Sequence, residues 1–221
     1  MRFWLTICML AFAFINLSAQ SMDELMKRYG MVDIKGLDST IVVDLMYAGA
    51  DNFVGEAMYH GLTKAYLHPK AAKALAVAAK ELRKVNPEYK LKVCDASRPM
   101  SAQRRMYQTV RGTSKAPYVS NPARGGGLHN YGMAVDITIV DKYGKELPMG
   151  TKVDHLGKEA NIDREYDLVR LKVITEDERK NRLLLRSVMR KAGFQPLRSE
   201  WWHFNYCTRR EAIAKYRILD F

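Results

Sequence analysis

Apolar residues recur every three or four positions in two long stretches of the chain, and this spacing predicts amphipathic helices. The first helix is expected to begin at His68-Pro69 and to end near Val85, because Asn86-Pro87 stops it. Its predicted apolar face consists of Ala71, Leu75, Ala78, Leu82 and Val85. The second helix is expected from Glu176 to Lys191, with Gly193 as its stop. Its predicted apolar face consists of Leu184, Val188 and Ala192.

Shorter patterns predict two more helices and four strands. One short helix is expected over 102–110 with Ser101 as its N-cap. Another follows Thr208, which stands three residues before Glu211 in the spacing of a capping box. Strands are expected over 39–46, 91–95, 134–140 and 201–206, because these runs are apolar or β-branched.

The order of these elements predicts the fold class. Strands and helices do not alternate as regular βαβ units, which favours an α+β domain over a doubly wound sheet. We therefore expect one domain with a central, mainly antiparallel sheet and flanking helices. Residues 48–63 and 111–130 are expected to be loops, and the second is long enough to indicate a functional loop.

The first nineteen residues have the pattern of a secretory signal peptide. Arg2 precedes an apolar run from Phe3 to Leu17, and small residues follow at Ser18 and Ala19. Cleavage after Ala19 would leave residues 20–221 as the exported domain, placed in the periplasm or cell envelope. An uncleaved anchor is the alternative, although the run is shorter than the roughly 20 residues of a membrane span.

The composition excludes some classes and raises one question about partners. Of 221 residues, 48% are hydrophobic and 27% are charged, which is ordinary for a globular domain and excludes extensive disorder. The formal charge is +12, and removal of residues 1–19 takes away only Arg2. Such a charge indicates an anionic partner, for example nucleic acid, a membrane surface or a wall polymer. Removal of the leader also leaves two cysteines, Cys94 and Cys207, for which a disulfide and two free thiols are both open.

Three residues form a candidate zinc site. His129 follows a glycine-rich run, Asp136 stands alone in an apolar strand, and His203 follows two tryptophans. Two imidazoles and one carboxylate are a ligand set that zinc hydrolases use. A buried carboxylate such as Asp136 also needs a partner, and a metal ion is a good one.

Glu200 is the candidate general base. It precedes His203 by three residues, and on a regular strand this odd offset places the two side chains on opposite faces. A turn or bulge at Trp201-Trp202 is therefore required if both are to reach one site. The alternatives are ordinary ones: a solvated Glu200, a surface histidine, and tryptophans that belong to the core. The chain contains neither His-Glu-x-x-His nor Gly-x-Ser-x-Gly, which excludes two common hydrolase signatures.

His129-x6-Asp136 followed by Glu200-x-x-His203 resembles the motif set of the zinc D-Ala-D-Ala metallopeptidases, a group that shares its fold with lysostaphin-type enzymes and hedgehog domains. Within that group the chain looks most like the VanX-type D-alanyl-D-alanine dipeptidases. The segments that match, between residues 40 and 206, are Asp44-Leu45, Tyr47-Ala48, Asn52-Phe53, Gly55, Asp95, Arg98-Pro99, the run from Gly144 to Gly150, and Asp154.

The resemblance implies a role for each matching residue. His129, Asp136 and His203 would bind one zinc ion, and Glu200 would act as the catalytic base. Arg98 would stabilise the oxyanion, and its alternative is a surface charge. Asp154 would receive the free amino group of the substrate, which makes a dipeptidase rather than a carboxypeptidase; its alternative is a loop salt bridge.

Two positions depart from the family pattern. Gly127 stands two residues before His129, where the family usually has serine, so a hydroxyl expected near the substrate is missing. Ser97 replaces the usual aromatic residue before Arg98, which is expected to be a change in packing.

The function predicted from the sequence is zinc-dependent hydrolysis of D-Ala-D-Ala in cell-wall peptide metabolism. The expected partner is a small peptide substrate. No nucleic-acid partner is expected, and no membrane span is expected in the mature chain. A D,D- or L,D-carboxypeptidase that trims peptidoglycan stem peptides is the alternative within the enzymes. A non-catalytic cell-wall-binding module is the alternative of another class. The sequence does not give the oligomeric state.

Overall fold

A five-stranded sheet forms the centre of the computed structural model, which describes residues 21–221. The predicted leader, residues 1–19, lies outside the described residues. The strands lie in the order β2 (Val42–Val43), β4 (Lys90–Asp95), β5 (Ala134–Val140), β7 (Glu200–Asn205) and β6 (Gln195–Leu197). Only β2 and β4 pair in parallel, so the sheet is mainly antiparallel as expected. A second, two-stranded antiparallel sheet joins β1 (Val32–Asp33) to β3 (Tyr66–Leu67).

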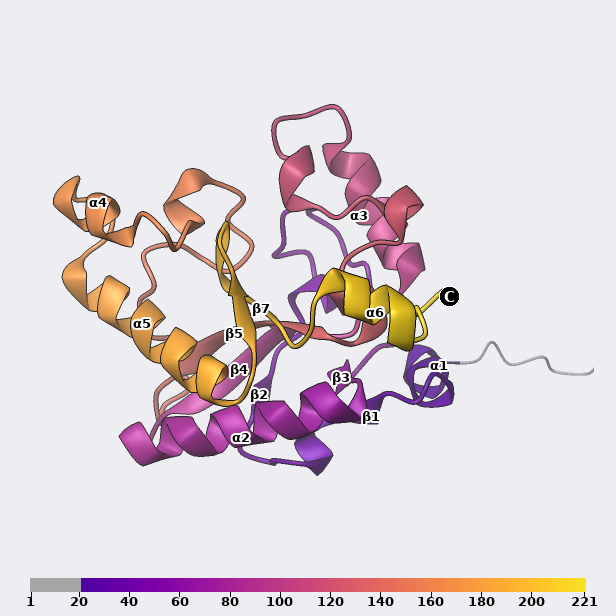
Figure 1. Cartoon of the computed structure of the whole chain (residues 1–221), viewed down its shortest axis with the longest axis horizontal. Helices are drawn as coiled ribbons and strands as arrows, with labels where there is room; N and C mark the ends of the chain where they lie inside the picture. The colour runs from indigo at the N-terminus through magenta and orange to yellow at the C-terminus, as the bar shows by residue number, and fades with distance from the viewer. Residues whose placement is uncertain (1–20) are drawn as a thin grey trace, which may run out of the picture.

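Six α-helices surround the sheets within residues 21–221. They are α1 (Met22–Arg28), α2 (Pro69–Val85), α3 (Met100–Val110), α4 (Glu165–Arg170), α5 (Glu176–Lys191) and α6 (Arg209–Lys215). The two long helices α2 and α5 pack against each other and against the sheet. In the view of Figure 1, α2 runs below the sheet and α3 lies above it. The molecule is therefore a mixed α and β domain with the long helices gathered on one side.

The two long helices confirm the periodicity argument, with corrections to their buried faces. Both have the predicted bounds, and α5 begins with a capping box in which Thr175 and Glu178 exchange hydrogen bonds. Val85 was predicted as part of the apolar face of α2, but it is exposed because it lies in the last turn. The buried face of α5 is also rotated: it is formed by Arg182, Leu185, Arg186, Val188 and Met189. Polar residues enter this face because the carboxylate of Glu165 pairs with both arginines.

Several predictions for shorter elements were wrong. The strand expected over 39–46 is reduced to Val42–Val43, because the chain turns into a 3-10 helix at Met46–Ala48. The helix α3 begins at Met100 with Pro99 as N-cap, and Ser101 lies inside it. The prediction of a long loop over 111–130 is confirmed, and the loop contains three short 3-10 turns, Ala116–Tyr118, Pro122–Arg124 and Leu128–Tyr131.

The two cysteines of the described chain are free. Cys94 is buried in β4, and Cys207 is half-buried after β7, so the disulfide alternative is wrong. None of the helices in residues 21–221 has both the length and the apolar character that a membrane crossing requires.

Candidate active site

Three acidic and basic side chains lie in one row across the middle of the sheet. In the strand register Asp95 of β4 faces Asp136 of β5, and Asp136 faces His203 of β7. Residues directly opposite on antiparallel strands have Cβ atoms about 5 Å apart, so their side chains share one face. The row therefore brings together residues that lie far apart in the chain: Asp95 and Asp136 are 41 positions apart, and Asp136 and His203 are 67 positions apart. Val135 and Ile137, the apolar residues on either side of Asp136, point to the opposite face by strand alternation.

A bulge in β4 turns Asp95 toward this face. Val93 pairs with Ile137, which is on the opposite face, but Asp95 pairs with Asp136 because the register shifts between Val93 and Asp95. Without the shift, strand alternation would place Asp95 on the same face as Val93. Bulges commonly re-aim side chains next to active sites, and this one adds a carboxylate to the row.

A second irregularity, in β7, confirms the bulge that the sequence required. Pro196 of β6 pairs with Phe204, but the next residue, Leu197, pairs with Glu200, so the extra residues lie between Glu200 and Phe204. As a result Glu200 Oε2 comes within 3.9 Å of His203 Nδ1, although the two are three positions apart. Both tryptophans in between are buried, with their rings nearly perpendicular, so they belong to the core.

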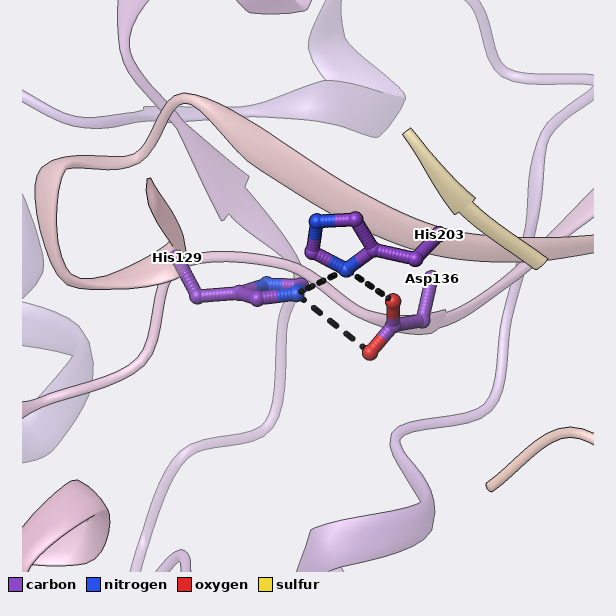
Figure 2. A group of neighbouring side chains, drawn as sticks. All are labelled: His129, Asp136 and His203. Atoms are coloured by element: carbon purple, nitrogen blue, oxygen red, sulfur yellow. Dashed lines mark hydrogen bonds and ion pairs between the residues drawn. The ribbon is translucent and has the colours of Figure 1, made fainter. Parts of the chain in front are cut away.

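The three predicted metal ligands meet in a buried cluster (Figure 2). His129 comes from the 3-10 turn Leu128–Tyr131, and its Nε2 lies 3.1 Å from His203 Nδ1. Asp136 spans the pair: Oδ1 lies 2.9 Å from His203 Nδ1, and Oδ2 lies 3.4 Å from His129 Nε2. Burial alone would raise the pKa of Asp136, but the two neighbouring imidazoles hold this pKa well below its usual value.

The outer hydrogen bonds of the two imidazoles show that the cluster fits a cation. His129 Nδ1 lies 2.7 Å from the carbonyl oxygen of Ala96, which can only accept, so Nδ1 carries the proton. His203 Nε2 donates in the same way to Asn205 Oδ1 at 2.8 Å. In the neutral rings, the two inner nitrogens are then bare and face each other beside a carboxylate. Three ligand atoms, one from each residue, that lie within 4.8 Å of one another suit a metal ion, and outer bonds of this kind orient metal-binding histidines.

Glu200 lies beside the cluster in a poorly solvated position. Its side chain is buried, and burial raises its pKa to about 7, against the attraction of His203, which lowers it. The alternative of a solvated surface charge is therefore wrong for Glu200. A carboxyl group with a pKa near neutrality both accepts and releases a proton readily.

Arg98 is buried and held from three sides. Its Nε and Nη2 donate to Asp95 Oδ2, its Nη1 donates to Gln103 Oε1, and the guanidinium stacks over the ring of Tyr47. Asp95 in turn accepts a hydrogen bond of 2.6 Å from the hydroxyl of Tyr59. These contacts exclude the alternative of a surface charge. A guanidinium has five N–H donors, so one N–H on each of Nη1 and Nη2 is left over from these bonds.

Asp154 lies at one side of the same cleft and has no salt bridge among the described residues. It accepts hydrogen bonds of 2.8 Å from the Tyr47 hydroxyl and from the Phe53 N–H, which are neutral donors. Burial raises the pKa of Asp154 to about 6. Its φ of 70° is unusual for a residue with a side chain, and such strain clusters at functional sites. The loop-salt-bridge alternative is therefore wrong.

One cleft of about 610 Å³ gathers all six residues predicted from the sequence. They are Arg98, His129, Asp136, Asp154, Glu200 and His203. Sequence reasoning assigned no role to the residues that hold them in place, which are Tyr47, Phe53, Tyr59, Asp95 and Gln103. The motif segments from Asp44 to Gly55 and at Asp95 were the signal for three of these residues, whereas nothing in the sequence indicated Tyr59 or Gln103.

Ser120 places a hydroxyl group beside Gly127, the position where the family usually has serine. A Cβ built on Gly127 would lie 2.7 Å from Ser120 Oγ, and both residues line the cleft. The backbone carbonyl of Ser120 accepts a hydrogen bond from Gln103, which also binds Arg98. This part of the cleft therefore has a hydroxyl group, although it comes from another residue. At the other departure, Ser97 is buried and its N–H donates to Tyr66, which agrees with a change in packing.

Two neighbouring glycines are expected to differ sharply in their tolerance of a side chain. Gly126→Ala should lower the free energy of unfolding by about 2–4 kcal/mol, because φ is +64° and the new Cβ would clash with Asn130 Oδ1. Gly127→Ser should change it by less than about 1 kcal/mol, because φ is −110° and the exposed Ser120 can rotate away. Denaturant unfolding of both variants checks this, and equal losses would contradict it.

The fold and the site define a class before any comparison with other proteins. Two imidazoles and a carboxylate that converge on one point, with a second carboxylate and a guanidinium in the same cleft, are typical of a metal-dependent hydrolase. The family model for D-Ala-D-Ala dipeptidases matches residues 27–221. The chain belongs to this family, which is a family of zinc-dependent metallopeptidases.

Individual relatives agree with the family match. A D-alanyl-D-alanine dipeptidase of Escherichia coli K12 is 31% identical over 176 residues, covering 79% of this chain and 83% of the relative. A D-alanyl-D-alanine dipeptidase of Synechocystis is 25% identical over 210 residues, covering 79% of each chain. A third, from Enterococcus faecalis, is 28% identical over 176 residues, covering 73% of this chain and 83% of the relative. The similarity therefore extends over most of both sequences.

Proposed function

We propose that the protein is a zinc D,D-dipeptidase that hydrolyses free D-Ala-D-Ala. The observation that carries the proposal is the convergence of His129 Nε2, His203 Nδ1 and the Asp136 carboxylate beside the buried Glu200. The names of the relatives supply the substrate. We also propose that residues 20–221 have the fold of the D-Ala-D-Ala metallopeptidases and hedgehog domains, which the family match supports.

His129, Asp136 and His203 would hold one zinc ion. When bound there, zinc would supply Lewis acidity and would lower the pKa of a bound water toward about 7. Glu200 accepts the proton of the attacking water on a carboxylate oxygen and then passes it to the nitrogen of the leaving D-alanine. The raised pKa of Glu200 suits both transfers, since neither protonation state is strongly preferred near neutral pH.

Arg98 and Asp154 would position the substrate around these transfers. The two free N–H groups of Arg98 are directed by Asp95 and Gln103, so they can donate to the oxygen that gains charge at the peptide carbonyl. Asp154 would bind the ammonium group of the dipeptide, because it is the carboxylate at the side of the cleft without a cationic partner of its own. A free dipeptide satisfies both groups at once.

The test of this function is metal analysis of the purified protein together with D-alanine release from D-Ala-D-Ala. We expect about one zinc ion per chain and turnover that a chelator abolishes and zinc restores. Protein that contains no zinc after zinc loading and releases no D-alanine would overturn the proposal. Binding of peptidoglycan without any hydrolysis would favour the wall-binding alternative.

The pH dependence of substrate capture is expected to report Asp154. Its carboxyl group must be ionised to bind an ammonium group, and burial raises its pKa to about 6. Below this pH, kcat/KM of the wild type for D-Ala-D-Ala should fall relative to that of Asp154→Asn, and the ratio of the two should drop about tenfold for each pH unit. The measurement is the ratio of wild type to variant between about pH 5 and about pH 7, in which titration of the shared metal ligands cancels. A ratio that stays constant over this range would contradict the assignment.

Export is a separate proposal that rests on the pattern of residues 1–19. A leader of this kind would direct the enzyme to peptides derived from the wall, and the basic mature chain suits an anionic envelope. Cell fractionation with N-terminal sequencing tests it. Recovery from the envelope fraction with an N-terminus near Gln20 is expected, and recovery only from the cytosol with Met1 intact would overturn it.

A further inference from the structure

A second cavity adjoins the cleft at Asp154. Its volume is about 740 Å³, somewhat larger than the 610 Å³ of the cleft that holds the catalytic residues. The two cavities share two lining residues, Phe53 and Asp154. We call these two residues the wall, because they are the lining residues that the two cavities have in common.

The wall is held together by short-range contacts. Phe53 donates its N–H to Asp154 Oδ2, and Tyr47 donates its hydroxyl to Asp154 Oδ1. The ring of Phe53 meets the ring of Tyr47 edge-on, with 6.2 Å between centroids. Phe53 is only partly buried, so its ring fills space between two cavities rather than the centre of the core.

The side chain of Asn52 makes most of the hydrogen bonds that hold the loop carrying Phe53. Asn52 Nδ2 donates to the carbonyl oxygens of Met46, Gly49 and Glu56, and Asn52 Oδ1 accepts from the N–H groups of Val54 and Gly55. The backbone around Phe53 is thus set by Asn52 and by Asp154, and the phenyl ring takes no part in these bonds. Truncation of the ring should therefore open the wall and leave the loop in place.

The second cavity offers polar groups of both charges to a ligand. Lys92 lies between the carboxylates of Asp44 and Glu146, and Lys152 lies 3.6 Å from Asp51. All five residues line this cavity. Paired charges of this kind suit the N-terminal part of a peptide, which brings amide donors, carbonyl acceptors and an ammonium group, better than they suit an apolar molecule.

We propose that the wall sets the length of the substrate, and that the second cavity is the space into which a peptide extended at its N-terminus would run. The inference rests on the proposed function. A free dipeptide ends at Asp154 with its ammonium group, so a further residue on that nitrogen must pass the point where Phe53 and Asp154 close the cleft. The substrate class that the wall excludes is therefore peptides that end in D-Ala-D-Ala and carry at least one more residue.

The test compares Phe53→Ala with wild type, both zinc-loaded, on D-Ala-D-Ala and on Gly-D-Ala-D-Ala. With the wall opened, kcat/KM for the tripeptide should rise by about tenfold or more, the effect expected from removing a steric block of side-chain size. The dipeptide should lose less than about tenfold, because Asp154 keeps its N–H donor. The matched control is Val153→Ala, which enlarges the second cavity alone and should leave the preference unchanged.

Each outcome has one meaning. Hydrolysis of the dipeptide by wild type without any gain for Phe53→Ala on the tripeptide overturns the wall alone, and so does an equal gain for Val153→Ala. Wild-type protein that hydrolyses neither peptide overturns the proposed function, and the wall with it. Zinc content equal to wild type shows that Phe53→Ala is folded; if it is not, Phe53→Leu is assayed in the same way with a smaller gain expected.

Discussion

Replacement of Glu200 by glutamine is expected to lower kcat for D-Ala-D-Ala by about 10²–10⁴-fold while the protein keeps its zinc. Glutamine has the same shape but neither accepts nor delivers the proton that the attacking water loses and the leaving amine gains. Glu200 lies 3.9 Å from His203 and is not part of the cluster of three ligands, so its loss should leave metal binding intact. The measurement is kcat from D-alanine release, with zinc determined on the same preparation.

The control for Glu200→Gln is Glu88→Gln, which changes an exposed glutamate that pairs with Lys142 on the surface. It should keep both zinc and turnover. A general base lost from the chemical step lowers kcat more than it changes KM, whereas a substrate-binding group raises KM. If Glu200→Gln keeps more than about half of the wild-type kcat, another group takes the proton, and the mechanism proposed here is wrong.

Local patterns predicted the long elements well, because each such element is determined by its own residues. The bounds of α2 and α5 follow from Pro69, Thr175 and Gly193, which start or stop a helix locally. β5 is an apolar run that is buried along its whole length. Short elements were harder, since two-residue strands such as β1 and β3 depend on pairing with each other rather than on their own pattern.

The candidate site was predicted as a list of residues, and its geometry was not. The row of Asp95, Asp136 and His203 depends on the register of three strands, and two bulges determine which side chains face the cleft. Register is set by the turns and by the packing of the whole sheet, so a local pattern cannot give it. The bulge in β7 could be stated only as a requirement, from the odd spacing between Glu200 and His203.

Residues that support the site were missed for a different reason. Gln103 lies on α3, where glutamine is an ordinary helix residue, yet it joins Arg98 to the Ser120 carbonyl across the cleft. Arg182 is fully buried on α5 and donates to the carbonyls of Met149 and Glu159, at the ends of the segment that contains Asp154. A single sequence predicts such residues as exposed, because charged side chains are seldom fully buried.

The second large effect is expected from Asp136→Asn, which should weaken zinc binding by more than about 100-fold and abolish turnover at ordinary zinc concentrations. Asp136 is the one carboxylate between the two bare imidazole nitrogens, so its loss removes both a ligand atom and the charge that balances a divalent cation. Wild type saturated with zinc at about 1,000 times its Kd should gain about 4 kcal/mol of stability, or roughly 10 °C in Tm. The variant should lose this gain, which thermal unfolding with and without zinc measures.

The metal-free variant is expected to unfold within a few degrees of metal-free wild type, because the new amide can donate to His203 Nδ1 or His129 Nε2 in place of the lost charge. This distinguishes a lost ligand from a damaged core, since a damaged core would lower Tm in both conditions. Asp177→Asn, an exposed change at the first turn of α5, is the control and should keep the full response to zinc. A zinc-induced rise in Tm that survives Asp136→Asn would show that the ion binds elsewhere, and the assignment of His129, Asp136 and His203 as ligands would then be wrong.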